Sequence, residues 1–487
     1  MKYLIPFCCL LLSLNLQAQD LIPAAQLQED FRILKESLEA LHPALYKYDS
    51  PEQRAKDFEI LKYQLSEDQS RLDAYRHFSL FAAKIKCGHT YGNFWNQSKE
   101  LRKEFIEAPN KVPFTFRIIE QEIYIYQNLS ESPDLKRGDK VISIDGFSAR
   151  EILDGLLPYV KADGANDGKR YFDLQVFGLD NFEAFDIYYP LAFYPGERID
   201  LIVEDYADQG TKAFDLAMIS RKERFNRLKE RYGKQIETYD DYWKFEIKDN
   251  KVGILTIGTF VTWRMSINWR KFIKDAFAEL KAKNIQHLIL DIRGNEGGNS
   301  AVQEMLYGYL TQQTAQIGPY QQSLKAQKVP DELRPYIGSW SKKMMDVSSR
   351  TYQLDNGFYT FKNKGLISGK VQAKGKAYSG QIYVLADASN SSGTYFLLNY
   401  IKQNQLATII GQESGGNLQG ITGGQIFYIK LPNSKVEIDL PVIGYYPTSE
   451  KANKGIEPDV YVKPNVKDLI KDIDSEMAKA LEMIQGI

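Results

Sequence analysis

The chain has 487 residues, more than one compact core usually contains, which predicts two or three domains. Its 43% hydrophobic and 26% charged residues exclude a disordered or fibrous protein. The 62 basic and 63 acidic side chains leave a net charge of −1, so the charge balance does not favour a nucleic-acid partner, whose phosphates need a basic surface.

The N-terminus is typical of a secretory signal. Lys2 precedes an apolar run over residues 3–14 that is too short to cross a bilayer, and the small residue Ala18 follows it. We therefore expect residues 1–19 to be a signal peptide that directs export across the inner membrane. The periplasm is the favoured destination, and an extracellular or outer-membrane-associated one stays open. No other segment is apolar for long enough to predict stable membrane insertion.

Cleavage of this signal leaves Cys87 as the one cysteine, since Cys8 and Cys9 lie within the signal. We therefore expect a fold without an intramolecular disulfide. The sequence contains no recognisable metal-ligand cluster, and no cofactor or metal is expected. The oligomeric state stays open.

The first two predicted domains differ in their patterns. Residues 20–107 have apolar positions at helical spacing, and Pro43 ends the first of these helices. Residues 108–219 contain short strand-like runs and then LKRGDKVISIDGFSAREIL, in which Gly138-Asp139 and Asp145-Gly146 form turns. This order resembles part of a PDZ domain, a fold that binds peptide ends by strand addition. Another small β-rich module with two tight turns is the alternative.

Residues 220–487 predict an α/β core. Residues 220–240 are highly charged and indicate a solvated helix or linker at the boundary. Buried strands then alternate with amphipathic helices, which is the pattern of a sheet covered by helices. We expect the strands near residues 252–260, 287–294, 382–387 and 407–411 and the helices near residues 267–283, 301–313 and 393–403.

Two strand-to-helix turns carry the candidate chemistry. In LILDIRGNEGGNS, Gly297 and Gly298 allow positive φ angles and leave the first N–H groups of a helix free for an anion or an oxyanion. In IYVLADASNSSGTYFLLNY, Ser392 begins a helix with the Gly393 N–H beside it. A structural turn and a helix cap are the alternatives. If the two strands are parallel neighbours, a hydroxyl meets N–H donors, which is the minimum for acyl transfer.

A general base is also needed, and His89 in the loop CGHTY is the candidate. The other histidines, His42, His77 and His287, are interpreted as packing or solvent-facing residues. Cys87 beside His89 leaves a thiol nucleophile as a less favoured alternative.

Five segments in order resemble the tail-specific or C-terminal processing serine peptidases: LILDIRGNEGG, YVLADASNSSGTYF, TIIGQESGGNLQG, IKLPNSKVEIDLP and GIEPDVYV. Their wider circle includes tricorn core peptidases and retinoid-binding interstitial proteins, and the resemblance covers roughly residues 240–465. It implies a ClpP/crotonase-like spiral core of ββα units. It also implies Ser392 as nucleophile, with Ser391 and Ser389 as near alternatives, and the Gly393 N–H with the Gly297-Gly298 turn as oxyanion donors.

The chain departs from the family pattern at two positions. Asn417 stands where many members have a Lys base, and Tyr395 stands where many have Glu. The resemblance to the His-using, tricorn-like branch implies His89 as base and a carboxylate before GIEPD, of which Glu450 is the nearest, to orient it.

We therefore predict a secreted serine endopeptidase that acts through an acyl-enzyme on Ser392 with His89 as general base. The partner would be a polypeptide substrate, recognised at its C-terminus by the PDZ-like domain. A non-catalytic peptide- or lipid-binding protein on the same fold is the alternative, and an acyl-CoA enzyme of the crotonase fold is a third, weaker one.

Overall fold

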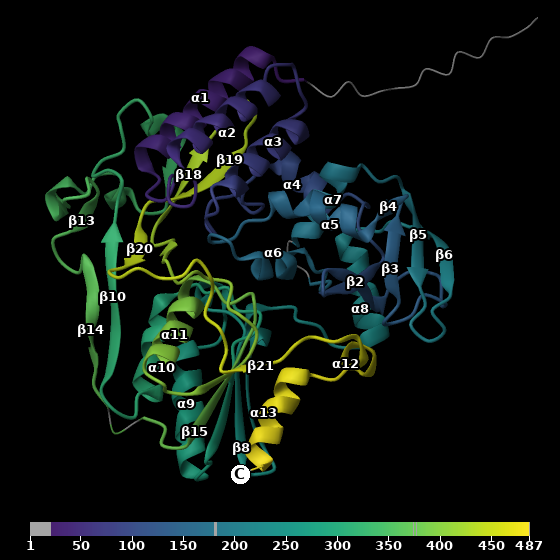
Figure 1. Cartoon of the computed structure of the whole chain (residues 1–487), viewed down its shortest axis with the longest axis vertical. Helices are drawn as coiled ribbons and strands as arrows, with labels where there is room; N and C mark the ends of the chain where they lie inside the picture. The colour runs from purple at the N-terminus through teal and green to yellow at the C-terminus, as the bar shows by residue number, and fades with distance from the viewer. Residues whose placement is uncertain (1–20, 180–182, 374, 376, 487) are drawn as a thin grey trace, which may run out of the picture.

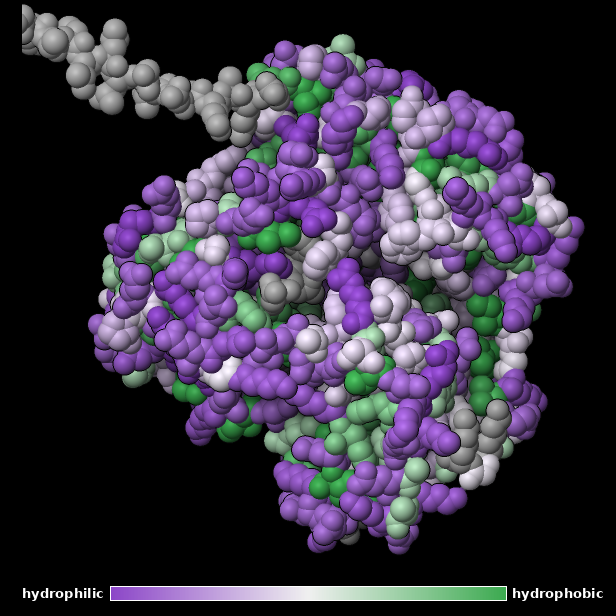
Figure 2. Space-filling model, turned by 180° about the vertical axis from the view of Figure 1, so that it is seen from behind, coloured by the Kyte–Doolittle hydropathy of each residue, from purple (hydrophilic) through white to green (hydrophobic). Residues whose placement is uncertain are grey.

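The computed structural model describes residues 21–179, 183–373, 375 and 377–486. The predicted signal peptide lies outside these residues. Within the described ranges, no helix has both the length and the apolar character needed to cross a bilayer. The face of the molecule in Figure 2 is mostly hydrophilic, with apolar side chains in small scattered groups.

Four helices form the N-terminal region, as predicted. Ser50, Ser70 and Ser98 cap three of them, each accepting a hydrogen bond from the N–H three residues on. The first ends just before His42, which precedes Pro43. The helices are α1 (Ala24–Leu41), α2 (Pro51–Gln64), α3 (Arg71–Lys84) and α4 (Lys99–Ile106).

A mixed region with an antiparallel sheet follows, in the strand order β1-β2-β3-β5-β6 with β4 on β3. Gly138 and Gly146, predicted as turn residues, both have positive φ. The strands are β1 (Phe114–Ile119), β2 (Glu122–Asn128), β3 (Lys140–Ile144), β4 (Phe147–Ser148), β5 (Arg198–Glu204) and β6 (Thr211–Ala217). The helices are α5 (Ala149–Leu156), α6 (Asp167–Leu174) and α7 (Ala184–Phe193).

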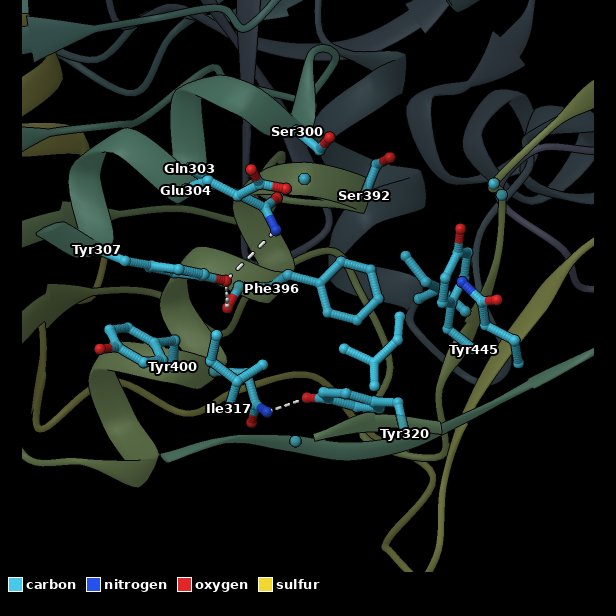
Figure 3. Close-up of a pocket in the computed structure, with 18 of the residues that line it drawn as sticks. Ser300, Gln303, Glu304, Tyr307, Ile317, Tyr320, Ser392, Phe396, Tyr400 and Tyr445 are labelled. Atoms are coloured by element: carbon cyan, nitrogen blue, oxygen red, sulfur yellow. Dashed lines mark hydrogen bonds between the residues drawn. The ribbon is translucent and has the colours of Figure 1, made fainter. Parts of the chain in front are cut away.

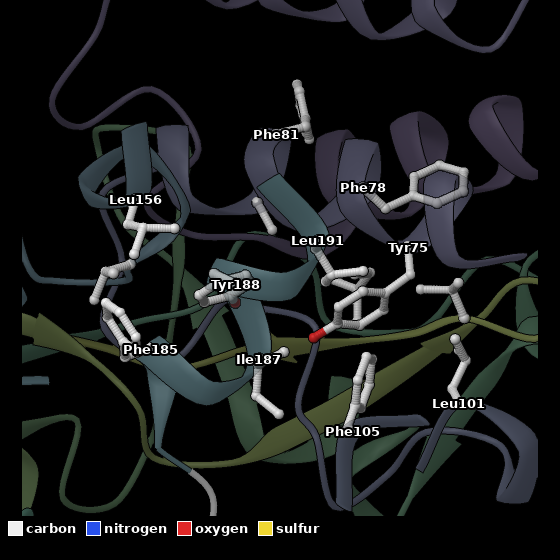
Figure 4. Packing of buried hydrophobic residues seen from close by; sticks show 14 of the residues in the cluster. Tyr75, Phe78, Phe81, Leu101, Phe105, Leu156, Phe185, Ile187, Tyr188 and Leu191 are labelled. Carbon is white, nitrogen blue, oxygen red and sulfur yellow. The ribbon is translucent and has the colours of Figure 1, made fainter. Parts of the chain in front are cut away.

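One hydrophobic core joins this region to the N-terminal helices. Figure 4 shows Tyr75 and Phe78 of α3 packed towards Tyr188 and Leu191 of α7, and all four are buried. The Tyr75 ring also lies 4.8 Å from that of Phe105. Burial of such large side chains contributes about 1.5–3 kcal/mol each.

The charged segment forms α8 (Arg221–Tyr232). Of the solvated helix or linker expected here, the structure has the helix, mostly exposed, but one side of it is buried: Arg224 is fully buried and forms ion pairs with Glu183 and Asp186. A buried guanidinium needs such partners. The helix therefore packs against α7.

The C-terminal half is built on a six-stranded sheet in the order β21-β16-β15-β9-β8-β7, parallel except for β7 (Figure 1). The register pairs Leu385 with Asp291, so β9 and β15 end side by side at one edge of the sheet. The two strands are therefore parallel neighbours, which is the condition under which the sequence places the two turns together. The strands are β7 (Trp243–Lys248), β8 (Val252–Ile257), β9 (His287–Asp291), β15 (Gln381–Ala386), β16 (Thr408–Gly411) and β21 (Val460–Tyr461).

Helices cover both faces of this sheet. The helices are α9 (Trp269–Ala282), α10 (Ser300–Leu310), α11 (Ser392–Gln403) and α13 (Ser475–Gln485). Helices α9, α10 and α11 pack with Leu255, Leu290 and Val384 on one face of the sheet. Helix α13 packs with Tyr383 and Ile410 on the other face. The short α12 (Val466–Lys471) precedes α13.

The sequence patterns did not predict several further strands of the C-terminal half. The sheet β14-β10-β20-β17 runs past α10 and α11 (Figure 1), and it comprises β10 (Ala315–Ser323), β14 (Leu366–Val371), β17 (Ile421–Thr422) and β20 (Gly444–Pro447). A second sheet comprises β11 (Ile337–Ser339), β18 (Ile426–Lys430) and β19 (Glu437–Pro441). A hairpin pairs β12 (Thr351–Gln353) with β13 (Tyr359–Phe361).

Candidate active site

Ser392 is the first residue of α11 and has a φ of 52°. This left-handed conformation is unfavourable for a residue with a Cβ and persists only where the surroundings enforce it. Residues held in this way concentrate at functional sites, and a strained strand-to-helix turn is the feature that exposes a nucleophilic hydroxyl in hydrolases. Ser392 is partly exposed and lines a cavity.

Two main-chain N–H groups beside Ser392 are free. Within the part of the chain that the structure describes, neither Gly298 nor Gly393 has a hydrogen-bond acceptor for its N–H. The Gly298 nitrogen lies 3.6 Å from the point where a Cβ on Gly393 would stand. The N–H of Gly297, by contrast, donates to Oδ1 of Asn295 at 2.8 Å. The N–H groups left without an acceptor are therefore those of Gly298 and Gly393, and not that of Gly297.

Gly297 contributes space to this arrangement. It has a φ of 95°, and a Cβ built on it would lie 2.6 Å from the Gly393 nitrogen and 2.9 Å from the Ser392 Cβ. Any side chain there would push the two turns apart. The glycine is required both by its backbone conformation and by the close approach of the nucleophile turn.

Two asparagines fasten the turns together. The Asn390 side chain donates to the carbonyls of Ile292 at 2.6 Å and Asn295 at 3.1 Å. Thr394 also donates to the Asn295 carbonyl, at 2.6 Å. These buried bonds hold α11 against the glycine turn. The sequence interpretation missed this role, although both asparagines stand inside the motifs that it singled out.

The neighbouring serines differ from Ser392 in their surroundings. Ser389 is fully buried and donates to the Asp387 carboxylate, whose pKa is raised to about 6 by burial. Ser391 caps α11 with its main chain, and its side chain makes no capping bond.

His89 lies in the loop after α3, with its ring against Gly423. A Cβ on Gly423 would lie 2.7 Å from Cε1 of His89, and Gly423 lines the cavity together with Ser392. The Nδ1 of His89 is buried and has no hydrogen-bond partner among the described residues. Gly423 thus lies against the predicted base and lines the same cavity as the predicted nucleophile, which is 303 residues from that base in the chain.

Burial lowers the pKa of His89, and the nearby Lys161 lowers it further, whereas the carboxylates of Asp163 and Glu296 raise it. The largest of these effects is burial. The imidazole is therefore neutral at neutral pH, which is the form that can accept a proton.

Among these carboxylates, Asp163 is the one held against the histidine loop. It is buried, and its Oδ1 accepts the N–H of Gly88 at 2.9 Å. Glu296 lies in the glycine turn and forms an ion pair with Lys169 of α6 at 3.4 Å. Glu450, the carboxylate implied by the resemblance, is exposed in the loop after β20. No sequence pattern links Asp163 to His89, so sequence analysis had no signal for it.

Asn417 and Tyr395, the two departures from the family pattern, are both buried. The Asn417 amide donates to the Asp163 carbonyl at 3.1 Å and to Asn453 at 2.7 Å, and its oxygen accepts the Gln419 N–H at 2.9 Å. This side chain therefore acts as a structural tie between loops.

The remaining candidates have other surroundings. His42 bonds to the Thr90 hydroxyl at 2.8 Å and accepts the Ala44 N–H at 3.0 Å. Cys87 is buried, and burial raises the pKa of its thiol to about 12, which disfavours the thiolate that a nucleophile needs.

Comparison with known proteins finds one family model and several similar folds. Residues 251–462 match the model of peptidase family S41. The structure of mature CPAF complexed with lactacystin is similar to this chain, with a TM-score of 0.63 at 13% identity, covering 94% of this chain and 97% of that one. Mature CPAF alone gives the same TM-score and identity, covering 94% and 96%. No curated protein sequence matches the chain.

An α/β sheet whose parallel strands bring a strained serine to free N–H donors is the architecture of a hydrolase that works by acyl transfer. Residues 251–462 are similar to peptidase family S41, and with this region the chain is a serine-type peptidase. The resemblance found in the sequence motifs is thereby confirmed.

The charges around His89 predict opposite pH effects for two substitutions. Asp163→Asn removes an anion that stabilises the imidazolium, so the acidic limb of the kcat/KM profile should move to lower pH. Lys161→Met removes a cation and should move it to higher pH. In the unaltered protein that limb should lie below about pH 6.5, the ordinary pKa of histidine. Peptide hydrolysis measured from about pH 4 to 9 checks this prediction. A shift of the acidic limb in the same direction for both variants would contradict it.

Proposed function

We propose that the chain is a secreted endopeptidase that cleaves polypeptides through an acyl-enzyme on Ser392. In this mechanism His89 takes the proton of the hydroxyl as it attacks the peptide carbonyl, and later returns it to the leaving amine. The N–H groups of Gly298 and Gly393 hold the oxyanion, and water then hydrolyses the ester. The observation that carries the proposal is the left-handed Ser392 at the start of α11, beside two unpaired N–H donors.

We propose Asp163 as the carboxylate that stabilises the imidazolium of His89 during proton transfer. Its contact with the Gly88 N–H and its burial support this role, since a buried anion acts through a low dielectric. Glu450 is the rival, and its exposure to solvent weakens the case for it.

The finer parts of the architecture belong to the same proposal. Residues 1–19 would be removed on export, with the periplasm as destination. Residues 20–107 would form the helical N-terminal domain, and residues 108–219 a PDZ-like domain that presents the C-terminal end of the substrate. Residues 220–487 would form a ClpP/crotonase-like core.

Hydrolysis of an unstructured polypeptide by site variants tests the proposal. His89→Ala should lower kcat by about 10⁴-fold, since a lost base leaves only oxyanion stabilisation and binding. Asp163→Asn should lower it by a smaller factor, and Glu450→Gln should leave it within about twofold of wild type, as for an exposed group. Full activity in His89→Ala would overturn the assignment of the base. A large loss in Glu450→Gln with little in Asp163→Asn would transfer the orienting role to Glu450.

A further inference from the structure

The cavity beside Ser392 has a volume of about 400 Å³ and lies between α10 and α11. Strand β10 closes it on the side away from Ser392, where Figure 3 shows Ile317 and Tyr320. A volume of this order is typical of sites that enclose a small ligand or a large side chain. The ring-bearing and aliphatic residues of its lining are Tyr307, Ile317, Tyr320, Ile367, Phe396, Tyr400, Ile421 and Tyr445.

Most polar groups in the walls are already paired with one another. The Asn399 amide donates to the Tyr320 hydroxyl, and the Gln403 amide donates to the Gly318 carbonyl at 2.9 Å. The Tyr400 hydroxyl bonds to that of Thr311 at 2.5 Å. An occupant therefore meets ring faces and aliphatic side chains, and it has few free donors or acceptors to satisfy in the walls.

The cavity also lacks a buried charge. Of the described residues that line it, Glu304 alone is charged at neutral pH, and its side chain is exposed at the rim. A Lys, Arg, Asp or Glu side chain that entered would lose its hydration without gaining a counter-charge, which disfavours its binding.

A buried side-chain atom in the wall is also unpaired. The Oε1 of Gln303 is buried without a hydrogen-bond partner among the described residues, and it lies 3.3 Å from the point where a Cβ on Gly393 would stand. A buried acceptor left unsatisfied is costly, and this one is next to a proposed oxyanion donor. A peptide N–H of a substrate bound at Ser392 would satisfy it.

We propose that this cavity binds the side chain on the acyl side of the cleaved bond and selects large, uncharged, apolar or aromatic residues there. Gln303 would accept a main-chain N–H of the same substrate. This inference rests on the proposed acyl transfer at Ser392, because the nucleophile and the donor Gly393 line the mouth of the cavity and so place the attacked carbonyl beside it.

A matched series of peptides that differ only in that residue tests the proposal, with Phe, Leu, Ala, Lys and Glu in turn. We expect kcat/KM for Phe and Leu to exceed that for Lys and Glu by about 100-fold or more. Cut sites are mapped by mass spectrometry, so that a preference is assigned to the correct residue. Equal rates across the series, or a preference for a charged residue, would overturn the proposal.

Ile317→Trp narrows the cavity at the end away from Ser392 and should lower kcat/KM for the Phe peptide about tenfold, while the Ala peptide is little affected. The matched control is Leu366→Trp, which adds the same bulk to the exposed side of the adjoining β14 and should leave both peptides unchanged. Gln303→Met should raise KM for the Phe and Ala peptides alike by about 3–10-fold, as expected for one lost hydrogen bond to the main chain.

Labelling with a fluorophosphonate distinguishes an error in the assignment of the cavity from an error in the proposed function. If Ser392 is labelled in wild type and in Ile317→Trp but the preference for Phe does not change, the assignment of the cavity is wrong and the proposed function stands. If wild type shows neither labelling nor hydrolysis, the proposed function is wrong and the assignment of the cavity is wrong with it.

Discussion

Ser392→Ala is expected to lower kcat for peptide hydrolysis by about 10⁴-fold or more, because the acyl-enzyme route is lost and only oxyanion stabilisation and binding remain. The free energy of unfolding should not fall, because alanine removes a hydroxyl from a partly exposed position. Steady-state hydrolysis of a fluorescent peptide, together with a thermal melt of each protein, measures both quantities.

Ser391→Ala is the control for this substitution. Ser391 is adjacent in sequence, and its side chain makes no capping bond, so its removal should change kcat by no more than a few-fold. If Ser391→Ala were inactive and Ser392→Ala active, the nucleophile would be the other serine. If both were active, neither of these two serines would be the nucleophile.

Gly297→Ala is expected to lower kcat/KM by about 10²–10³-fold, the loss typical of a disrupted oxyanion hole. The added Cβ would lie 2.6 Å from the Gly393 nitrogen, so the nucleophile turn must move away from the N–H of Gly298. The positive φ adds strain of about 1–3 kcal/mol, which a lowered melting temperature should report.

Gly294→Ala separates these two effects. Gly294 lies in the same loop with a φ of 76°, but a Cβ there meets no atom within 4 Å. It should therefore lower stability by a similar amount while kcat/KM changes little. Equal losses of activity in the two variants would show that backbone strain alone accounts for the effect of Gly297→Ala.

The sequence was most informative where chemistry and secondary structure are local. The turns with Gly297, Gly298 and Ser392 each follow a buried strand. The apolar runs that form these two strands were enough to predict where the turns lie. The parallel pairing of β9 and β15 then brought them together. The sequence could not show that the N–H of Gly297 is already bonded to Oδ1 of Asn295. That bond depends on the conformation of the Asn295 side chain within the turn.

Other parts of the site have no local signature. Asp163 meets the histidine loop across a tertiary contact, and no spacing in the sequence relates the two. The lining from β10 was missed because AQIGPYQQS mixes polar and apolar residues without a clean period of two, and it contains a Pro at a bulge. The burial of Arg224 was missed because charge in a helix usually indicates solvent, whereas here two carboxylates of another segment pair with it.

Mapping the site of a fluorophosphonate adduct tests the central claim most directly. The protein is labelled, digested and analysed by tandem mass spectrometry, with Ser392→Ala and His89→Ala treated in parallel. The mechanism predicts one adduct on Ser392 in wild type, slower formation of that adduct in His89→Ala, and none in Ser392→Ala. An adduct on another residue, or the same labelling in wild type and Ser392→Ala, would contradict it.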